Sequence, residues 1–188
     1  CLFIQPVFAT ELSCGGFVLK LLDDSGSFSI GYQDSDGKIV DFFTSHDEYT
    51  STFFAVKKGK NIYKLNRDSS VDFSTYSTEN SIGLKYEVDK DLQVYVDFSF
   101  CPEFDGSTQS VIRVDVTLHN LSTKTQSVML KGVFDTCLGE FLENHFSTAV
   151  NQYVSNEQYY KSMSVEKWIR SSNGKYSVQF LLDGAGIT

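Results

Sequence analysis

The chain has 188 residues, 41% of them hydrophobic, and contains 16 Phe and 10 Tyr but only 2 Pro. This aromatic-rich composition predicts a folded β-protein, because a disordered chain lacks the apolar side chains that form a core. The 24 acidic and 16 basic residues give a net charge of −8. No stripe of Lys and Arg of the kind that neutralises phosphates occurs, so the sequence predicts no nucleic-acid partner.

The first nine residues, CLFIQPVFA, are apolar and end where the composition turns polar. Val7 and Ala9 have the sizes that signal peptidase accepts before its cut, so residues 1–9 are predicted to be the remnant of a signal peptide. A first β-strand and a lipid-carrying Cys1 are the alternatives. The protein is therefore predicted to be exported, to the periplasm, the cell surface or the medium. No run of about 18 apolar residues occurs, so no transmembrane segment is expected.

From Phe17 onward, short apolar or alternating runs are interrupted every eight to twelve residues or so by Gly, Asp, Asn and Ser, a spacing typical of antiparallel sandwiches and barrels. The predicted strands cover residues 17–22, 27–33, 38–43, 51–56, 62–65, 71–76, 83–88, 92–100, 110–120, 126–136, 165–170 and 176–182. The sequence thus predicts an all-β fold, an antiparallel β-sandwich, with residues 10–188 as a single domain. The closing DGAGIT is typical of a turn that leads into another strand, so the chain is expected to be the N-terminal part of a longer protein.

The predicted strand over residues 110–120 alternates between polar and apolar side chains. Arg113 and His119 fall on one face, whereas Val114 and Leu118 fall on the other. This alternation predicts an antiparallel strand with one side in the core and one side in solvent.

The stretch GVFDTCLGEFLENHFST, residues 132–148, is the densest group of ionisable residues near the end of a predicted strand. Asp135, Glu140, Glu143 and His145 are its candidate ligand-binding residues, because binding residues concentrate in loops held by a rigid scaffold. Three interpretations stay open. The oxygen atoms could bind Ca²⁺, a glutamate with His145 could form an acid–base pair, or the side chains could simply be solvated.

The same stretch contains the only candidate helix, over residues 138–145. Its apolar residues and His145 recur at intervals of three and four, as on one face of a short helix. A loop is the alternative. The sequence predicts at most this one short helix.

Neither the cysteine spacing nor any known catalytic motif indicates a reaction or a metal site. If residues 1–9 are removed, Cys14, Cys101 and Cys137 remain, and none belongs to a C-x-x-C zinc pattern. Cys101 and Cys137 are predicted to be small buried thiols, with a disulfide between them as the alternative. Neither G-x-S-x-G nor a glycine-rich nucleotide loop occurs. No catalytic residue is therefore assigned, and no cofactor is expected other than Ca²⁺ under the first interpretation above.

The order of several segments resembles a known class of proteins. A long strand ending in His-Asn-x-Ser, a second strand running into GVFDTCLGE, a His-Phe pair and a Trp-Ile pair occupy residues 111–120, 128–140, 145–146 and 168–169. This order resembles an uncharacterised class of secreted spirochaete-type β-sandwich proteins, and the β-rich architecture resembles part of a galactose-mutarotase-like supersandwich. The resemblance implies a large antiparallel sandwich exported from a bacterium. It does not imply mutarotase activity, because His46, His119 and His145 do not match the paired histidines of those enzymes.

Together these observations predict a non-catalytic, secreted or envelope-associated β-sandwich that binds a partner protein or a glycan through its end loops. Residues 135–148 are the favoured binding patch. One alternative is a carbohydrate-active enzyme of the supersandwich type that uses Glu140 or Glu143 with His145. The other alternative is a structural calcium-binding domain.

Overall fold

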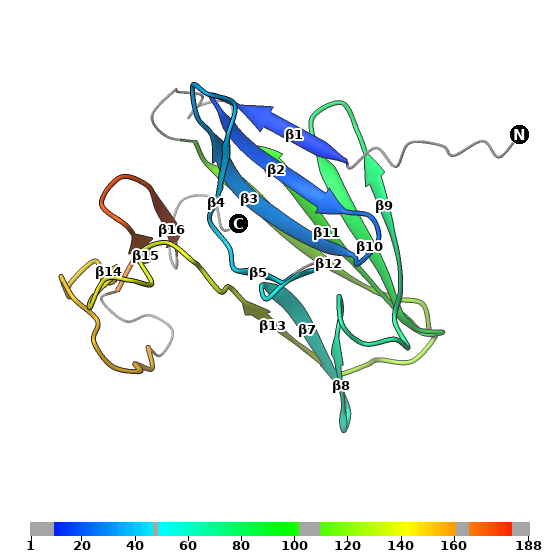
Figure 1. Cartoon of the computed structure of the whole chain (residues 1–188). Helices are drawn as coiled ribbons and strands as arrows, with labels where there is room; N and C mark the ends of the chain where they lie inside the picture. The colour runs from blue at the N-terminus through cyan, green and yellow to red at the C-terminus, as the bar shows by residue number, and fades with distance from the viewer. Residues whose placement is uncertain (1–9, 47–48, 102–109, 161–165, 182–188) are drawn as a thin grey trace, which may run out of the picture. The chain divides into compact units, whose positions relative to one another are not determined.

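The structure is a computed structural model that describes residues 10–46, 49–101, 110–160 and 166–181 (Figure 1). The predicted signal-peptide remnant, residues 1–9, lies outside the described residues. The all-β prediction is confirmed, and the antiparallel sheets stack as in a β-sandwich. None of the described segments forms a helix with the length and apolar character needed to cross a membrane.

The contacts of the chain fall into two compact units, where the sequence predicts one domain. Unit 1 is residues 1–135 and unit 2 is residues 136–188. The strands of unit 1 are β1 (Glu11–Cys14), β2 (Phe17–Leu22), β3 (Ser27–Gln33), β4 (Ile39–Asp41), β5 (Ser45–His46), β6 (Tyr49–Thr50), β7 (Phe53–Lys58), β8 (Asn61–Lys64), β9 (Asp72–Ser77), β10 (Ile82–Asp89), β11 (Leu92–Phe100), β12 (Ile112–Asn120) and β13 (Val128–Val133). The strands of unit 2 are β14 (Phe146–Thr148), β15 (Trp168–Ser172) and β16 (Ser177–Leu181).

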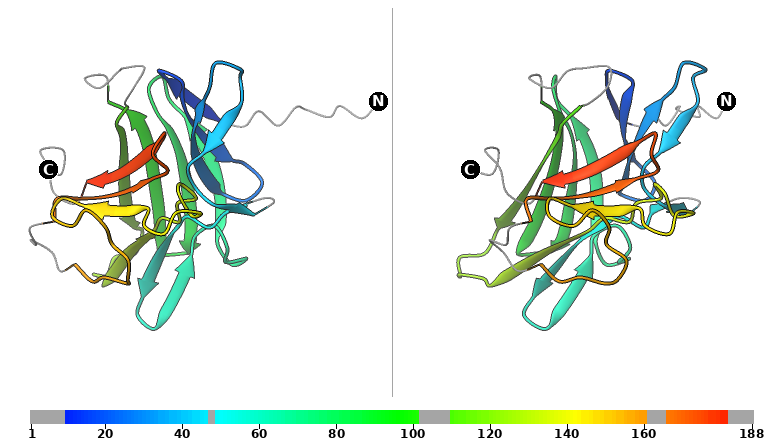
Figure 2. Two further views of the ribbon diagram at one scale, coloured as in Figure 1. Left: turned by 60° about the vertical axis from the view of Figure 1, so that its left-hand side comes forward. Right: turned by 90° about the vertical axis from the view of Figure 1, so that its left-hand side faces the viewer.

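Two four-stranded sheets form the layers of unit 1. One has the order β1-β2-β3-β4 and the other has the order β12-β11-β10-β9, and all their pairings are antiparallel. The views in Figure 2 show them as separate layers. A smaller sheet of order β13-β7-β8 and the short β5-β6 pair complete the unit.

Aromatic side chains fill the space between these sheets. The ring of Phe28 lies 4.8 Å from that of Phe98 and stacks at 5.9 Å on that of Phe54, measured between ring centroids. Phe28 also meets Phe43 edge to face at 6.0 Å. Because β3, β7 and β11 each contribute a ring, Phe28 joins all three larger sheets of unit 1.

A buried tyrosine links the two four-stranded sheets through a hydrogen bond. Tyr86 of β10 is 2% exposed, and its hydroxyl donates to the carbonyl oxygen of Gly26 at 2.5 Å. On the outer face of the same sheet, the Tyr76 hydroxyl donates to Asp97 Oδ1 at 2.5 Å. Burial raises the pKa of Tyr86, and burial together with the Asp97 carboxylate raises the pKa of Tyr76.

These two raised pKa values predict alkaline unfolding. A tyrosine in the unfolded chain loses its proton at about pH 10. In the folded protein, Tyr76 and Tyr86 still hold their protons at that pH. The free energy of unfolding is therefore at its full value below about pH 10 and falls as pH rises above it. Far-UV circular dichroism during chemical unfolding, repeated at increasing pH, measures this fall, and phenolate absorbance reports the titration. If all tyrosines of the folded protein ionised in one step at about pH 10, the prediction would be contradicted.

Strand β12 differs from its expected burial. Its polar face is exposed as predicted, but its apolar face is also open: Val114 and Leu118 are each 37% exposed. On β11, the residues paired with them, Phe98 and Val94, are fully buried. The difference arises because β12 is the last strand of its sheet, and no other described strand pairs with its outer edge.

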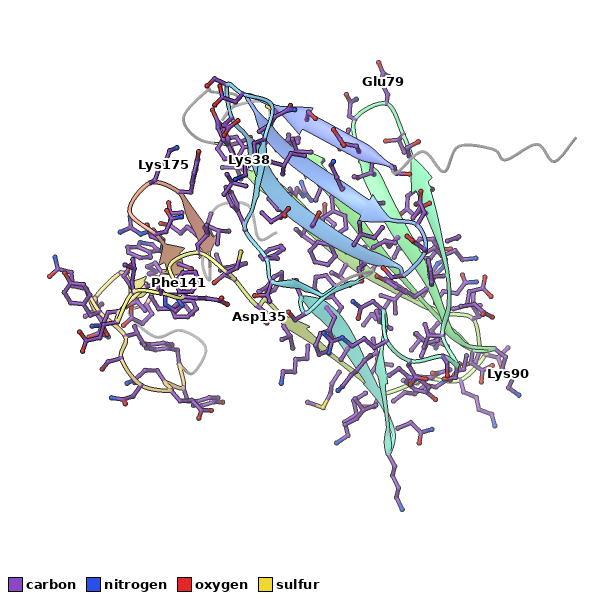
Figure 3. The ribbon with its side chains drawn as sticks, in the orientation of Figure 1. Lys38, Glu79, Lys90, Asp135, Phe141 and Lys175 are labelled. Atoms are coloured by element: carbon purple, nitrogen blue, oxygen red, sulfur yellow. The ribbon has the colours of Figure 1, made fainter. Side chains whose placement is uncertain are left out.

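Unit 2 contains a three-stranded antiparallel sheet of order β14-β15-β16. Its β15–β16 hairpin turns at Gly174 and Lys175, because the Asn173 N–H group still donates to the Tyr176 carbonyl oxygen; the turn thus lies slightly beyond the predicted Asn-Gly position, and Lys175 stands at its tip (Figure 3). Gly174 has φ +86°, and Asn173 Oδ1 accepts hydrogen bonds from the N–H groups of Lys175 and Tyr176. Asn173 therefore occupies the first position of the turn, where its side chain accepts these bonds, and Gly174 provides the positive φ of the next position.

Residues 138–145 form a turn rather than a helix, so the loop alternative is correct there. Gly139 has φ +79°, which interrupts helical geometry after a single residue. The N–H group of Leu142 donates to the Gly139 carbonyl oxygen at 2.8 Å, which closes the turn. Helical spacing of apolar residues was a weak signal here because the segment is short and contains a glycine.

Candidate functional site

The predicted site residues are divided between the two units. Asp135 is the last residue of unit 1 and is exposed (Figure 3). Its N–H group donates to Thr52 Oγ1 at 2.9 Å, and its carbonyl oxygen accepts a hydrogen bond from the Thr44 N–H group at 3.0 Å. The backbone of Asp135 therefore fastens the end of unit 1 to the segment before β7.

The other three predicted residues belong to unit 2. Glu140 and Glu143 are exposed, and His145 is half-buried, with its ring 4.3 Å from that of Phe146. Among the described residues, Glu143 makes no hydrogen bond or ion pair. His145 alone of the four predicted residues lines the depression described next.

A shallow depression of about 200 Å³ lies on unit 2 and is open to solvent. The side chains that line it and carry the argument below are Asn144, His145, Phe146, Gln152, Tyr153 and Arg170. They come from the segment that leads into β14, from the loop that follows it, and from β15. We call this group the unit 2 depression.

Strand pairing brings the two ends of the depression together. Phe146 of β14 pairs with Ser171 of β15, and the Ser172 N–H group donates to the His145 carbonyl oxygen at 3.0 Å. The buried Ser171 hydroxyl donates to the Leu138 carbonyl oxygen at 2.9 Å. These bonds hold the backbone on either side of His145 against β15.

Gly139 lets the turn before β14 pack closely against the same strands. A Cβ atom at Gly139 would lie 2.6 Å from His145 Cβ and even nearer the Ser172 carbonyl oxygen. Its positive φ adds a second reason for glycine, because other residues rarely adopt that conformation. The position of His145 therefore depends on the absence of a side chain at residue 139.

A buried carboxylate anchors the loop that carries Gln152 and Tyr153. Glu166 is 5% exposed and accepts hydrogen bonds from the Val150 N–H group at 3.2 Å and from Asn151 Nδ2 at 3.0 Å. The Asn151 N–H group also donates to Thr148 Oγ1 at 2.9 Å. A buried charge costs free energy unless it is hydrogen-bonded, so Glu166 stabilises this one loop conformation.

The depression combines planar polar groups with an aromatic wall. Arg170 offers guanidinium donors and lies 5.8 Å from the Trp168 ring centroid, measured from Cζ. Asn144 Oδ1 is buried at the site and accepts no hydrogen bond from the described residues. Tyr153 is 66% exposed, so one face of a large ring is available to a ligand. Such a set can donate hydrogen bonds to hydroxyl or carboxylate oxygens and can accept hydrogen bonds from hydroxyl groups, beside an apolar surface.

Three residues of the depression were not predicted from the sequence: Gln152, Tyr153 and Arg170. Arg170 falls in a predicted strand and had no feature that set it apart from other strand residues. Gln152 and Tyr153 lie in a connection without a motif. The acceptor that fixes this connection, Glu166, lies 15 and 16 residues beyond the two residues that donate to it. The sequence contained no local signal for them.

No metal centre or disulfide is added by the structure. Over the ranges that the structure describes, no three His, Cys, Asp or Glu side chains are placed to hold a metal ion. Calcium binding by Asp135, Glu140 and Glu143 stays a prediction. Cys14, Cys101 and Cys137 are present as thiols and all three are half-buried, so Cys101 and Cys137 are less buried than predicted.

Comparison with known proteins returned no match: no protein-family model, no curated protein and no solved structure is similar to this chain. The resemblance to secreted spirochaete-type proteins and to the galactose-mutarotase-like supersandwich therefore stays a prediction.

Proposed function

We propose that the protein is an exported, non-catalytic β-protein that binds a glycan, and that the unit 2 depression holds one sugar ring of it. Export is inferred from the apolar opening stretch, residues 1–9. The observation that carries the binding proposal is the convergence of Asn144, His145, Tyr153 and Arg170 on one solvent-open depression.

The size of the depression favours a small ligand group. Its volume of about 200 Å³ is below the range of about 300–1,000 Å³ that holds drug-sized ligands. One sugar ring of a longer glycan suits this volume, with the rest of the chain lying outside in solvent. Binding through so small a site is expected to be weak and to gain strength where several copies engage one polysaccharide.

The chemistry of the lining also favours a sugar. A sugar ring presents hydroxyl groups around its edge and C–H groups on its faces. Arg170 and Gln152 provide donors for the hydroxyl oxygens, and the exposed Tyr153 ring provides a surface for the C–H face. A small rotation of the Asn144 side chain would present its unpaired oxygen to a ligand hydroxyl, which removes the cost of a buried acceptor without a partner.

A binding role suits these residues better than the predicted alternative of a carbohydrate-active enzyme. Acid–base catalysis requires a carboxylate within reach of the reacting proton. Neither Glu140 nor Glu143 lines the depression. Asp135 does not line it either.

The test is a titration of the ¹⁵N-labelled chain with glucose, galactose and N-acetylglucosamine, followed by NMR. We expect one of these sugars to shift the amide signals of residues 144–147, 152–153 and 170–172. Arg170→Ala is expected to raise the dissociation constant roughly 10- to 150-fold, because a hydrogen bond from a charged donor contributes roughly 1.5–3 kcal/mol. Tyr153→Ala is expected to weaken binding by removing the ring surface.

Two variants outside the depression are matched controls. Arg113→Ala removes an exposed arginine in unit 1, and Tyr159→Ala removes a tyrosine that is 89% exposed. Both should bind the sugar as the unmodified chain does. Equal weakening by the controls, or the absence of signal shifts at the depression with all three sugars, would count against a glycan site there.

A further inference from the structure

Strand β12 presents a long, open edge. It has nine residues and lies at the end of the sheet β12-β11-β10-β9, so its outer side has no partner strand within the described ranges. An edge strand of this kind exposes a row of N–H and C=O groups that can pair with another chain.

The pairing with β11 shows which backbone groups of β12 point outward. The Val111 carbonyl oxygen accepts from the Cys101 N–H group, and the Leu121 N–H group donates to the Asp91 carbonyl oxygen. The register between these two contacts is continuous, from Phe100↔Ile112 to Leu92↔Asn120. In an antiparallel pair, hydrogen-bonding residues alternate along a strand. Odd-numbered residues therefore bond to β11. The backbone groups that face the open edge belong to Ile112, Val114, Val116 and Leu118.

Several features that usually protect an edge are missing from β12. Natural edge strands are protected by charged side chains, above all lysine, by proline, by a β-bulge or by being very short. β12 contains neither proline nor lysine, and its register with β11 has no shift, whereas the β10–β11 register shifts between Glu87 and Asp89. Val114 and Leu118 are each 37% exposed on the apolar face of this strand. The strand therefore carries only Arg113 and Asp115 as charged side chains, and its edge is partly apolar.

The charges on β12 favour a second copy of the same strand. Arg113 and Asp115 lie two residues apart on the polar face, with Arg113 Nε 2.7 Å from Asp115 Oδ2. When two copies of β12 run antiparallel about a twofold axis at Val114, Arg113 of each copy lies opposite Asp115 of the other. These are non-hydrogen-bonded positions, where facing side chains approach most closely.

Other registers lack this complementarity. A twofold axis at Asp115 would place two like carboxylates directly opposite each other, which is unfavourable. An axis at Val116 would place Arg113 opposite His119 and leave Asp115 opposite Thr117. The axis at Val114 also places the exposed Val114 side chains of the two copies opposite each other, beside half-buried Ile112 and Val116.

We propose that the protein forms a homodimer in which β12 pairs antiparallel with β12 of a second copy about a twofold axis at Val114. In this register the strand residues that pair are 112–116 of each copy, and the two four-stranded sheets become one continuous eight-stranded sheet. Arg113 and Asp115 fix the register through two equivalent ion pairs across the axis. This interface does not depend on the proposed glycan site.

The test measures the dimer dissociation constant by sedimentation equilibrium of the full chain over a wide range of concentrations. Arg113→Asp and Asp115→Arg each place like charges opposite each other, so each is expected to raise that constant at least about tenfold. The double variant Arg113→Asp/Asp115→Arg exchanges the charges and should dimerise again. Mixing the two single variants should also give a dimer, because each copy then presents the opposite charges of the other.

Lys85 and Glu87 provide a matched control on the same sheet. They lie two residues apart on β10, an interior strand, and their charged atoms are also 2.7 Å apart. Lys85→Glu and Glu87→Lys introduce the same like-charge pairs within one strand without changing the open edge. Both should dimerise as the unmodified chain does, and circular dichroism of every variant verifies that it is folded.

A backbone variant tests the edge itself. Val114→Pro removes an N–H group that faces outward and leaves the hydrogen bonds to β11 intact, because proline is tolerated at such edge positions. It is expected to abolish the dimer while the circular-dichroism spectrum stays unchanged. A chain that is monomeric at every concentration, a dimer that survives Val114→Pro, or failure of the two mixed single variants to associate would overturn the proposal.

Discussion

Replacing Phe28 by alanine is expected to lower the free energy of unfolding of unit 1 by roughly 3–5 kcal/mol. Phe28 is 2% exposed and contacts the rings of Phe43, Phe54 and Phe98. The substitution removes three aromatic contacts. It also leaves a cavity that the surrounding strands can fill only by shifting from their positions. Denaturant unfolding followed by far-UV circular dichroism measures the loss.

Phe141 provides the control for this substitution. It is fully exposed, at 101% of the reference area, so Phe141→Ala removes the same atoms without opening a cavity (Figure 3). Its effect should stay within about 0.5 kcal/mol of zero. Equal losses from the two substitutions would mean that Phe28 does not hold the sheets together.

Gly139→Ala is expected to destabilise unit 2 strongly or to unfold it. The new methyl group would overlap the Ser172 carbonyl oxygen and would lie 2.6 Å from His145 Cβ, and neither the backbone nor a Cβ atom can move aside freely. Overpacking of this kind costs about 1–3 kcal/mol. The positive φ of 79° adds about 1 kcal/mol or more. Trp168 is the sole tryptophan of the chain and lies in unit 2, so its fluorescence reports this unit alone.

Gly174→Ala separates the two causes. Gly174 has φ +86°, but a Cβ atom there would meet no other atom within 4 Å. This variant has the cost of positive φ without the overlap, so it should destabilise unit 2 by only about 1 kcal/mol. If both glycine variants shift the Trp168 unfolding transition equally, close packing at Gly139 is not what positions His145.

Much of the sheet structure could be predicted because strand periodicity is local. Three predicted strands, residues 17–22, 27–33 and 92–100, have the bounds found for β2, β3 and β11. Their side chains alternate clearly or form short apolar runs, and Asp or Gly marks the turns beside them. The short strands β1, β5, β6 and β14 were not predicted, because two to four residues show too little periodicity.

Pairing between distant segments could not be predicted. The expected strand over residues 126–136 shortens to β13, and its pairing with β7 depends on contacts about 70 residues apart in the sequence. The open apolar face of β12 was also missed. Alternation shows that one face is apolar, but only the order of the strands shows that Val114 and Leu118 lie at an unpaired edge.

Of the four predicted site residues, only His145 is part of the candidate site. His145 was singled out because ionisable residues cluster near it in the sequence, and it does line the depression. Arg170 and Tyr153 reach the same place through strand pairing and through the anchoring of a loop by Glu166. Neither the strand pairing nor the Glu166 anchor produces a recognisable sequence pattern near the residue that it positions.

The interior of unit 2 has a consequence for how the depression behaves. Of the described residues in this unit, the buried ones are chiefly polar: Thr136, Thr148, Glu166 and Ser171 accompany a single buried leucine, Leu138. A region held mainly by hydrogen bonds, with little apolar burial, opens locally at a small cost in free energy. Its backbone amides would exchange rapidly with solvent deuterium, and a ligand in the depression would slow that exchange by favouring the closed form. Ligand binding in the depression and local ordering of unit 2 would then be thermodynamically coupled.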